Sequence, residues 1–311
     1  MVMRKWRSSL SNLYHSRKLS DLIARKVMLV ATIFSGLIVF GMAFALFYKA
    51  WPILSTHPME KLLLSSSWRP TRGEFGLYPF IMGTLWVTIL AMTLAAPLCL
   101  LTSVYLAEYA PRRIRGIIKP LIDLLAGIPS VVYGAWGVLL VVPLLRDYVA
   151  PLVGATTTGY SVMAGSIVLA IMVFPIIISV SEEVIKAVPQ EIREASFALG
   201  ATKWQTVKHV VLRSSFPGII AGIILGFSRA FGETIAVLMV VGNVSKAPSS
   251  LFDPAYPLTA LIANNYGEML SVPLYDSALM LAALILLLVV LFFNVIARIV
   301  LSKIKRRFAI G

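Results

Sequence analysis

The chain has 311 residues, of which 59% are apolar and 14% are charged, and its 28 Lys and Arg against 14 Asp and Glu give a net charge of +14. Soluble domains average about 45–50% apolar and about 25% charged residues, so the composition argues against a soluble globular protein. It argues more strongly against a disordered one, because so apolar a chain does not stay solvated. The positive charge is typical either of a nucleic-acid-binding surface or of the cytoplasmic loops of a membrane protein.

Signatures of catalysis and metal binding are missing from the sequence. Cys99 is the only cysteine, and the three histidines, His15, His57 and His209, are far apart. We therefore expect no disulfide and no metal site. The chain has no H-E-x-x-H, G-x-S-x-G or P-loop sequence, so we expect no catalytic residue and no ATP-hydrolysing site on it.

Six apolar segments reach or exceed the ~20 residues that cross a bilayer as an α-helix. They predict an all-α integral membrane protein with six transmembrane helices. The segments are Val27–Tyr48, Phe80–Ala107, Leu121–Leu145, Ser161–Ser181, Ser214–Gly242 and Ser277–Ala297.

The first segment follows a basic leader of 26 residues and has 22 residues itself. Ala43-Phe44-Ala45 resembles a signal-peptide cleavage site, but leader and apolar stretch are both longer than in an ordinary signal. We therefore favour an uncleaved anchor. The basic residues that start the leader predict a contact with anionic membrane lipid; they are Arg4, Lys5, Arg7, Arg17 and Lys18.

Two prolines lie inside predicted spans, Pro129 in the third and Pro175 in the fourth. Each removes a backbone hydrogen bond from its helix. A static kink is the favoured interpretation, and a hinge or an opened turn that lines a path is the alternative.

The loop at about residues 182–213 carries signals for two short helices. They are Pro189 as a helix start, Ile192, Ala195 and Leu199 as an apolar stripe, Gly200 as a stop and Thr202–Gln205 as a capping box. Two interpretations stay open for the first helix: a connector that lies on lipid headgroups, or a helix that enters a groove on a partner.

The fifth segment contains two charged residues near its middle, Arg229 and Glu233. Charges inside a membrane are costly and usually face protein or water. At spacing i, i+4 the two can neutralise each other, and Gly218, Gly222 and Gly226 fall in the same helical sector, which predicts close packing on a neighbour. One interpretation is an ion pair that fixes helix register. The other is an anion path, in which the planar fork of Arg229 binds an oxyanion and Glu233 holds Arg229 when the path is empty.

The basic residues are distributed unevenly between the two predicted sides of the membrane. With the N-terminus in the cytoplasm, 21 of them lie in cytoplasmic segments, six lie in outer loops, and Arg229 lies within a span. This asymmetry predicts that both termini are cytoplasmic, and it removes the case for a nucleic-acid partner. We divide the chain into a basic N-terminal segment (1–26), a transmembrane domain (27–297) and a basic tail (298–311).

The cytoplasmic loop resembles a known family. Glu194-Ala195-Ser196-Phe197-Ala198-Leu199-Gly200-Ala201, followed by Phe216-Pro217-Gly218, is similar to the EAA loop of ABC importer permeases. Leu212-Arg213 departs from the frequent Leu-Pro of that family. The resemblance implies a fold like that of type I ABC importer permeases. It also implies that Glu194, Ala195, Gly200 and Ala201 couple this chain to a separate ATPase subunit, which would hold ATP and Mg.

Two further stretches narrow the resemblance. The runs from Leu125 to Gly134 and from Ser228 to Val237 are similar to the C-type permease of phosphate importers of the Pst type, more than to its A-type partner. This implies an inner-membrane heterodimer with an A-type permease, two ATPase subunits, an extracytoplasmic phosphate-binding protein, and phosphate as cargo. The matching motifs imply a substrate path at Arg229, Glu233, Thr234 and Ser130.

Other functions remain as alternatives. A permease for another oxyanion, such as molybdate or sulfate, would look alike, because one arginine does not discriminate among tetrahedral anions. An ion-coupled secondary transporter often has broken helices repeated in two halves, and the sequence shows none. A membrane hydrolase is disfavoured by the missing catalytic motifs. We therefore expect a transport subunit that is not itself an enzyme.

Overall fold

The computed structural model of the protein describes the backbone of residues 2–268 and 271–309 and the side chains of residues 21–268 and 271–302. The basic side chains at residues 4–18, predicted to contact lipid, and those beyond residue 302 lie outside the described side chains. Helices dominate, with π-helical turns (η2 to η5), one 3-10 turn (η1) and a two-stranded antiparallel sheet. In chain order the elements are α1 (Val2–Thr56), α2 (Met59–Leu64), β1 (Trp68–Arg69), η1 (Pro70–Arg72), β2 (Glu74–Phe75), α3 (Tyr78–Val104), η2 (Tyr105–Tyr109), α4 (Arg112–Gly127), α5 (Ser130–Trp136), η3 (Gly137–Val141), α6 (Val142–Leu144), η4 (Leu145–Val149), α7 (Ala150–Leu152), α8 (Val162–Lys186), α9 (Gln190–Ala198), α10 (Lys203–Thr206), η5 (Val207–Val211), α11 (Leu212–Gly232), α12 (Ile235–Val240), α13 (Leu258–Asn265) and α14 (Tyr275–Ala309).

The chain divides into two compact units at residues 49 and 50. The first unit is the greater part of α1, which runs without a break through residues 43–45. The second unit contains the last turns of α1 and every later element.

Six helices of the described chain are long and apolar enough to cross a membrane, which confirms the predicted number. They run over Asp21–Thr56, Tyr78–Tyr109, Ser130–Leu152, Val162–Lys186, Lys203–Gly232 and Tyr275–Ser302. The third and fifth spans differ most from the prediction.

The third predicted span, Leu121–Leu145, is wrong because it joins two helices. α4 ends at Gly127 and α5 begins at Ser130, with Ile128 and Pro129 extended between them. A proline disfavours helical backbone in the residue before it and suits the start of a helix, since it has no N–H to satisfy. Pro129 therefore separates two helices instead of kinking one. Pro175, by contrast, lies inside an unbroken α8.

The fifth predicted span, Ser214–Gly242, is also interrupted. α11 ends at Gly232, Glu233 is extended, and α12 begins at Ile235. The carbonyl of Glu233 accepts a hydrogen bond from the Thr259 hydroxyl (3.1 Å), so the first turn of α13 satisfies a backbone group at the break. The chain therefore has two broken helices, which apolarity alone did not reveal.

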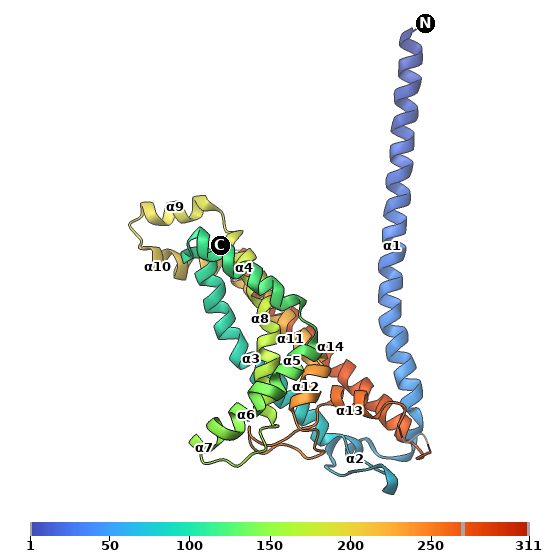
Figure 1. Cartoon of the computed structure of the whole chain (residues 1–311). Helices are drawn as coiled ribbons and strands as arrows, with labels where there is room; N and C mark the ends of the chain where they lie inside the picture. The colour runs from blue at the N-terminus through green and yellow to red at the C-terminus, as the bar shows by residue number, and fades with distance from the viewer. Residues whose placement is uncertain (1, 269–270, 310–311) are drawn as a thin grey trace. The chain divides into compact units, whose positions relative to one another are not determined.

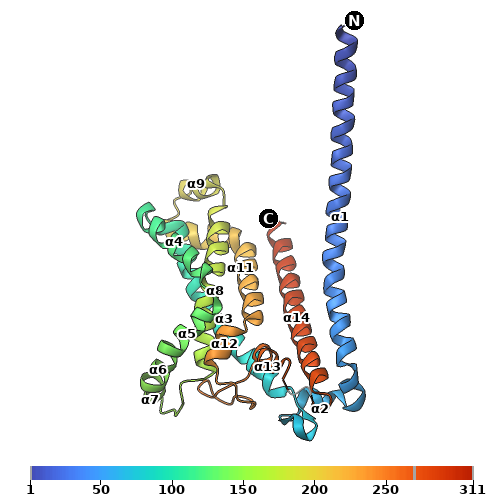
Figure 2. The ribbon, with the colours of Figure 1, turned by 45° about the vertical axis from the view of Figure 1, so that its right-hand side comes forward.

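α3, α8 and α11 form the centre of the second unit (Figure 1). Their shared core contains small and branched side chains, among them Ala91, Val173, Ile177 and Ala230. α9 lies at one end of these helices, and α6, α7 and α13 lie at the other, in both views (Figure 1, Figure 2). The two functional regions predicted from sequence belong to different parts of this bundle.

The loop that follows α12 is fixed by one carboxylate. Asp253 accepts hydrogen bonds from the Ser249 hydroxyl (2.7 Å) and from the backbone N–H groups of Ser249 and Ser250 (2.9 Å each). These bonds, that from the Ser249 hydroxyl first, hold the pKa of Asp253 below its ordinary value. The carbonyl of Asp253 in turn accepts from the N–H of Val162 (2.9 Å), which joins the loop to the start of α8.

Candidate functional site

The break between α11 and α12 brings three of the predicted path residues together. Arg229 lies in the last turn of α11, Glu233 is the first residue after it, and Thr234 precedes α12. α12 packs against α5, which contains the fourth predicted path residue, Ser130, and also Tyr133. Ser130 precedes Tyr133 by three residues and so lies on the same side of α5.

Arg229 and Glu233 do not form the predicted ion pair. Among the described side chains the ion pairs are Arg146–Asp147, Lys186–Glu182 and Arg193–Glu108. The helix ends at Gly232, so the i, i+4 geometry does not apply to Glu233. Its Oε1 instead accepts a hydrogen bond from the N–H of Ala236 (3.2 Å) and caps the start of α12.

Arg229 is exposed on the second unit, whereas Glu233 is half-buried. No hydrogen bond or ion pair joins the Arg229 guanidinium to another described side chain. A guanidinium offers five donors in a planar fork that suits an oxyanion. Charged residues inside apolar spans usually face protein or water, which keeps Arg229 as a candidate site residue.

A very small cavity lies behind the break. It has a volume of about 10 Å³, which is roughly the space of one water molecule. Thr84, Thr88, Glu233 and Thr259 contribute polar groups to its wall. Glu233 therefore shares the wall of this cavity with three threonines.

The glycines of α11 lie against α8. A Cβ added at Gly218 would overlap Val184, and one at Gly226 would overlap Ile177. At Gly222 the nearest atom would be Val180 Cγ1 at 3.1 Å. The two helices approach each other closely because glycine has no side chain to separate them. The prediction that Arg229 and Glu233 share this neighbour is wrong, since Arg229 is exposed and Glu233 lies beyond the helix.

The loop predicted to be cytoplasmic forms the two predicted helices. Gly200 ends α9 with a φ of +82°, a conformation that favours glycine. Thr202 and Gln205 form the capping box at the start of α10. Glu194 and Ala195 are exposed, Ala201 is half-buried, and Ile192 (42%) and Leu199 (90%) expose apolar side chains.

The other face of α9 holds contacts that the sequence analysis missed. Arg193 donates to Glu108 Oε1 (2.9 Å) and to the carbonyls of Ile185 (2.9 Å) and Val188. Ser196 and Thr206 share a hydroxyl hydrogen bond of 2.9 Å. The sequence did not indicate the pair of Arg193 and Glu108 for two reasons. An arginine on the polar face of an amphipathic helix is ordinarily solvated, and Glu108 is 85 residues away in sequence.

The two regions lie at opposite ends of α11. Arg229 is 17 residues beyond Leu212, where α11 begins, which corresponds to about 26 Å of helix. The path residues and the loop residues are therefore brought into two groups and not into one site.

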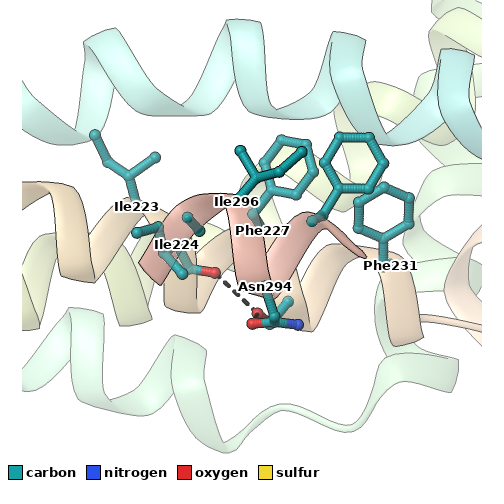
Figure 3. A pocket seen from close by; sticks show the side chains of 9 residues that line it. Ile223, Ile224, Phe227, Phe231, Asn294 and Ile296 are labelled. Carbon is teal, nitrogen blue, oxygen red and sulfur yellow. Dashed lines mark hydrogen bonds between the residues drawn. The ribbon is translucent and has the colours of Figure 1, made fainter. Parts of the chain in front are cut away.

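A cavity of about 290 Å³ lies elsewhere, between α11 and α14 (Figure 3). Its wall is apolar except for Ser228 and Asn294, which are joined to each other because the Ser228 hydroxyl donates to Asn294 Oδ1 (2.8 Å). No charged residue lines it. No cluster of three His, Cys, Asp or Glu residues able to hold a metal occurs in the described part of the chain.

Comparison with known proteins gives a family and close relatives. The family described as binding-protein-dependent transport system inner membrane component matches residues 99–307. A probable ABC transporter permease protein, YqgH, of Bacillus subtilis is 39% identical over 80% of this chain and 79% of its own length. The phosphate transport system permease proteins PstC of Mesorhizobium japonicum and Pasteurella multocida are 34% and 32% identical; the alignments cover 93% and 99% of this chain and 92% and 99% of theirs.

Solved structures share the fold at low sequence identity. A permease chain of a bacterial ABC transporter involved in the import of alginate matches with a TM-score of 0.58 at 15% identity, over 92% of this chain and 99% of its own. A chain of the MetNI methionine ABC transporter matches with a TM-score of 0.56 at 17% identity, over 73% and 95%.

Proposed function

The chain belongs to the family of binding-protein-dependent transport inner membrane components, and from this premise we propose that it is the permease subunit of an ATP-driven importer of inorganic phosphate. Phosphate is inferred as the cargo from the phosphate transport permeases that align with this chain over 92–99% of their own length. The exposed Arg229 at the break between α11 and α12, which pairs with no carboxylate among the described side chains, supports it, because a planar fork of donors suits a tetrahedral oxyanion. Phosphate enters near Arg229, with Ser130, Thr234 and Glu233 beside it.

The proposal assigns the remaining parts of the importer to partners. An extracytoplasmic binding protein delivers phosphate, an A-type permease completes the path next to the exposed Arg229, and two ATPase subunits bind ATP and Mg. α9 is presented to an ATPase subunit by Glu194, Ala195, Gly200 and Ala201. The exposed apolar side chains of Ile192, Phe197 and Leu199 support this, since several apolar groups exposed on one short segment favour a partner. Both termini lie in the cytoplasm, as the excess of basic residues on that side favours.

Reconstitution tests the proposal directly. The chain, co-expressed with its neighbouring permease and ATPase genes, is placed in liposomes with ATP inside and binding protein outside, and uptake of radioactive phosphate is measured. We expect uptake that requires ATP and binding protein, and ATPase activity that phosphate stimulates. Uptake that proceeds without ATP, driven by an ion gradient, would identify a secondary transporter instead.

Competition separates phosphate from the other oxyanions. Unlabelled phosphate should abolish the uptake of labelled phosphate, whereas a tenfold excess of sulfate or molybdate should leave it unchanged. The converse result, uptake of labelled sulfate or molybdate with no effect of phosphate, contradicts the proposed cargo and leaves the importer class intact.

A further inference from the structure

The position of α9 depends on polar contacts and not on packing. None of its nine residues, all of which the structure describes, is buried. Beneath it lies a cavity of about 320 Å³, whose wall includes Glu108, Arg193 and Phe197. A helix without a buried apolar face is not fixed by hydrophobic contacts. The few side-chain contacts on its inner face therefore determine where it lies.

Arg193 supplies most of these contacts. Its guanidinium joins α9 to Glu108 Oε1 (2.9 Å) and to the carbonyls of Ile185 (2.9 Å) and Val188 at the end of α8. The side chains of Arg193 and Glu108 are only 13% and 11% exposed. Breaking such a shielded pair leaves an uncompensated charge, so the pair constrains its surroundings more than a surface pair does.

Glu108 belongs to η2, the π-helical turn that ends α3, and α4 is attached to the same turn. Arg115 of α4 donates to the carbonyls of Leu106 (2.9 Å) and Ala107 (3.0 Å). The turn is thus bound by an arginine of α9 on one side and by an arginine of α4 on the other. π-helical turns are frequent at functional sites.

The far end of α4 contacts the helix that carries Ser130. The carbonyl of Leu125 accepts a hydrogen bond from the Tyr133 hydroxyl of α5 (2.8 Å), and α5 packs against α12, which begins just after the break that follows Arg229. α4 has 16 residues and is therefore about 24 Å long. It connects the region of α9 to the region of Arg229 by a route separate from the covalent one through α10 and α11.

We propose that Arg193 and Glu108 are positioning residues that transmit the movement of α9 to the substrate path. The inference rests on the proposed function, in which an ATPase partner moves α9. The ion pair carries that movement to η2, and the bonds of Arg115 carry it to α4. α4 carries it through Tyr133 to α5, which packs against α12 at the break that follows Arg229. Coupling between distant sites needs such a contiguous set of contacts between rigid elements.

The first test measures transport per ATP in the full complex in liposomes. Arg193→Gln and Glu108→Gln should lower phosphate uptake per ATP hydrolysed at least about tenfold while ATPase activity persists, and Arg193→Lys should restore part of it, since it keeps the charge. The control is Arg146→Gln, which breaks an exposed pair (53% and 46% exposed) between neighbouring residues and should change nothing. Unchanged uptake per ATP in both glutamine variants overturns the inference.

The second test does not depend on the cargo. Spin labels at the exposed Glu191 on α9 and Lys119 on α4 report the distance between these helices with and without ATP. We expect ATP to leave this distance unchanged in the unmodified complex, because the helices move together, and to change it in Arg193→Gln. An equal change of this distance in the unmodified complex and in Arg193→Gln contradicts the inference. If the expected distances are found but phosphate is not transported, the proposed cargo fails and the coupling route stands. If Arg193→Gln does not assemble, Glu108→Gln takes its place with the same deciding outcomes.

Discussion

Arg229 is the basic residue whose surroundings differ most from what its sequence suggests. The spacing to Glu233 predicted a neutralised pair, but the helix ends between the two residues and Glu233 caps α12 instead. Arg229 is left exposed in the last turn of α11. A cation that has no carboxylate to release binds an anion without first breaking an ion pair. The gating role considered for Glu233 is therefore not supported by its contacts.

The anion role of Arg229 is tested by Arg229→Gln. A hydrogen bond to a charged group contributes about 1.5–3 kcal/mol, so phosphate uptake should fall about 10- to 100-fold or more. Arg229→Lys, which keeps the charge and loses the fork, should fall less. Both complexes should assemble normally, as judged by size-exclusion chromatography, because Arg229 has no hydrogen bond to lose within the described side chains. Loss of assembly in Arg229→Gln would favour the register-fixing role.

At the scale of elements, the turn after α9 depends on one glycine. Gly200 has a φ of +82°, and a residue with a Cβ loses roughly 1–2 kcal/mol in that conformation. Gly200→Val should shift α9 away from its partner and uncouple ATPase activity from uptake while the protein still inserts. Gly200→Asn is the matched control, because asparagine tolerates left-handed backbone, and it should retain most of the uptake. Normal uptake in Gly200→Val contradicts the coupling role of this loop.

The close packing of α11 against α8 leads to a second prediction at the scale of elements. A Cβ at Gly218 would overlap Val184, whose branched side chain has little freedom to move. Gly218→Ala should destabilise the protein by about 1–3 kcal/mol, seen as a lower melting temperature in detergent. Adding Val184→Ala should restore part of the loss. Gly116→Ala, where no atom lies within 4 Å of the new Cβ, should be neutral or slightly stabilising.

Local signals explain which elements could be predicted. Apolar length gave the number of spans, and Pro189, Gly200 and the capping box gave the loop helices, because each of these signals acts within a few residues. The breaks at Pro129 and Glu233 were not predicted, because a helix can end inside an apolar stretch without any change in the mean hydropathy of the sequence. The backbone carbonyl of Glu233, just after α11, accepts a hydrogen bond from Thr259, which lies 26 residues later in the chain.

The candidate site was likewise predictable only where its residues are close together in the sequence. Arg229, Glu233 and Thr234 are near in sequence and remain together in space. The contacts of Tyr133 with α4 and of Arg193 with Glu108 depend on how separate helices pack, and no spacing along the chain encodes them. Pairs 85 residues apart become visible only in the folded molecule.

At the scale of the whole molecule, the orientation in the membrane can be measured. The distribution of basic residues, 21 against six, predicts a cytoplasmic C-terminus. Cys99 is fully buried and so will not compete for a label. Ser245→Cys should react with an impermeant maleimide in intact cells, and Ser302→Cys should react only after the membrane is opened. Labelling of Ser302→Cys in intact cells would reverse the orientation.

The π-helical turns also determine where residues can be removed from this chain without changing how its helices pack. η5, Val207–Val211, holds one residue more than an α-helical turn of similar length. Removing Lys208 or His209 converts it to an ordinary turn and leaves α10 and α11 facing their present neighbours, so such a variant should still assemble. Removing Ala221 from the middle of α11 rotates everything before it by about 100° relative to everything after it, and should abolish assembly. Natural length variation in this span is therefore expected to concentrate at η5.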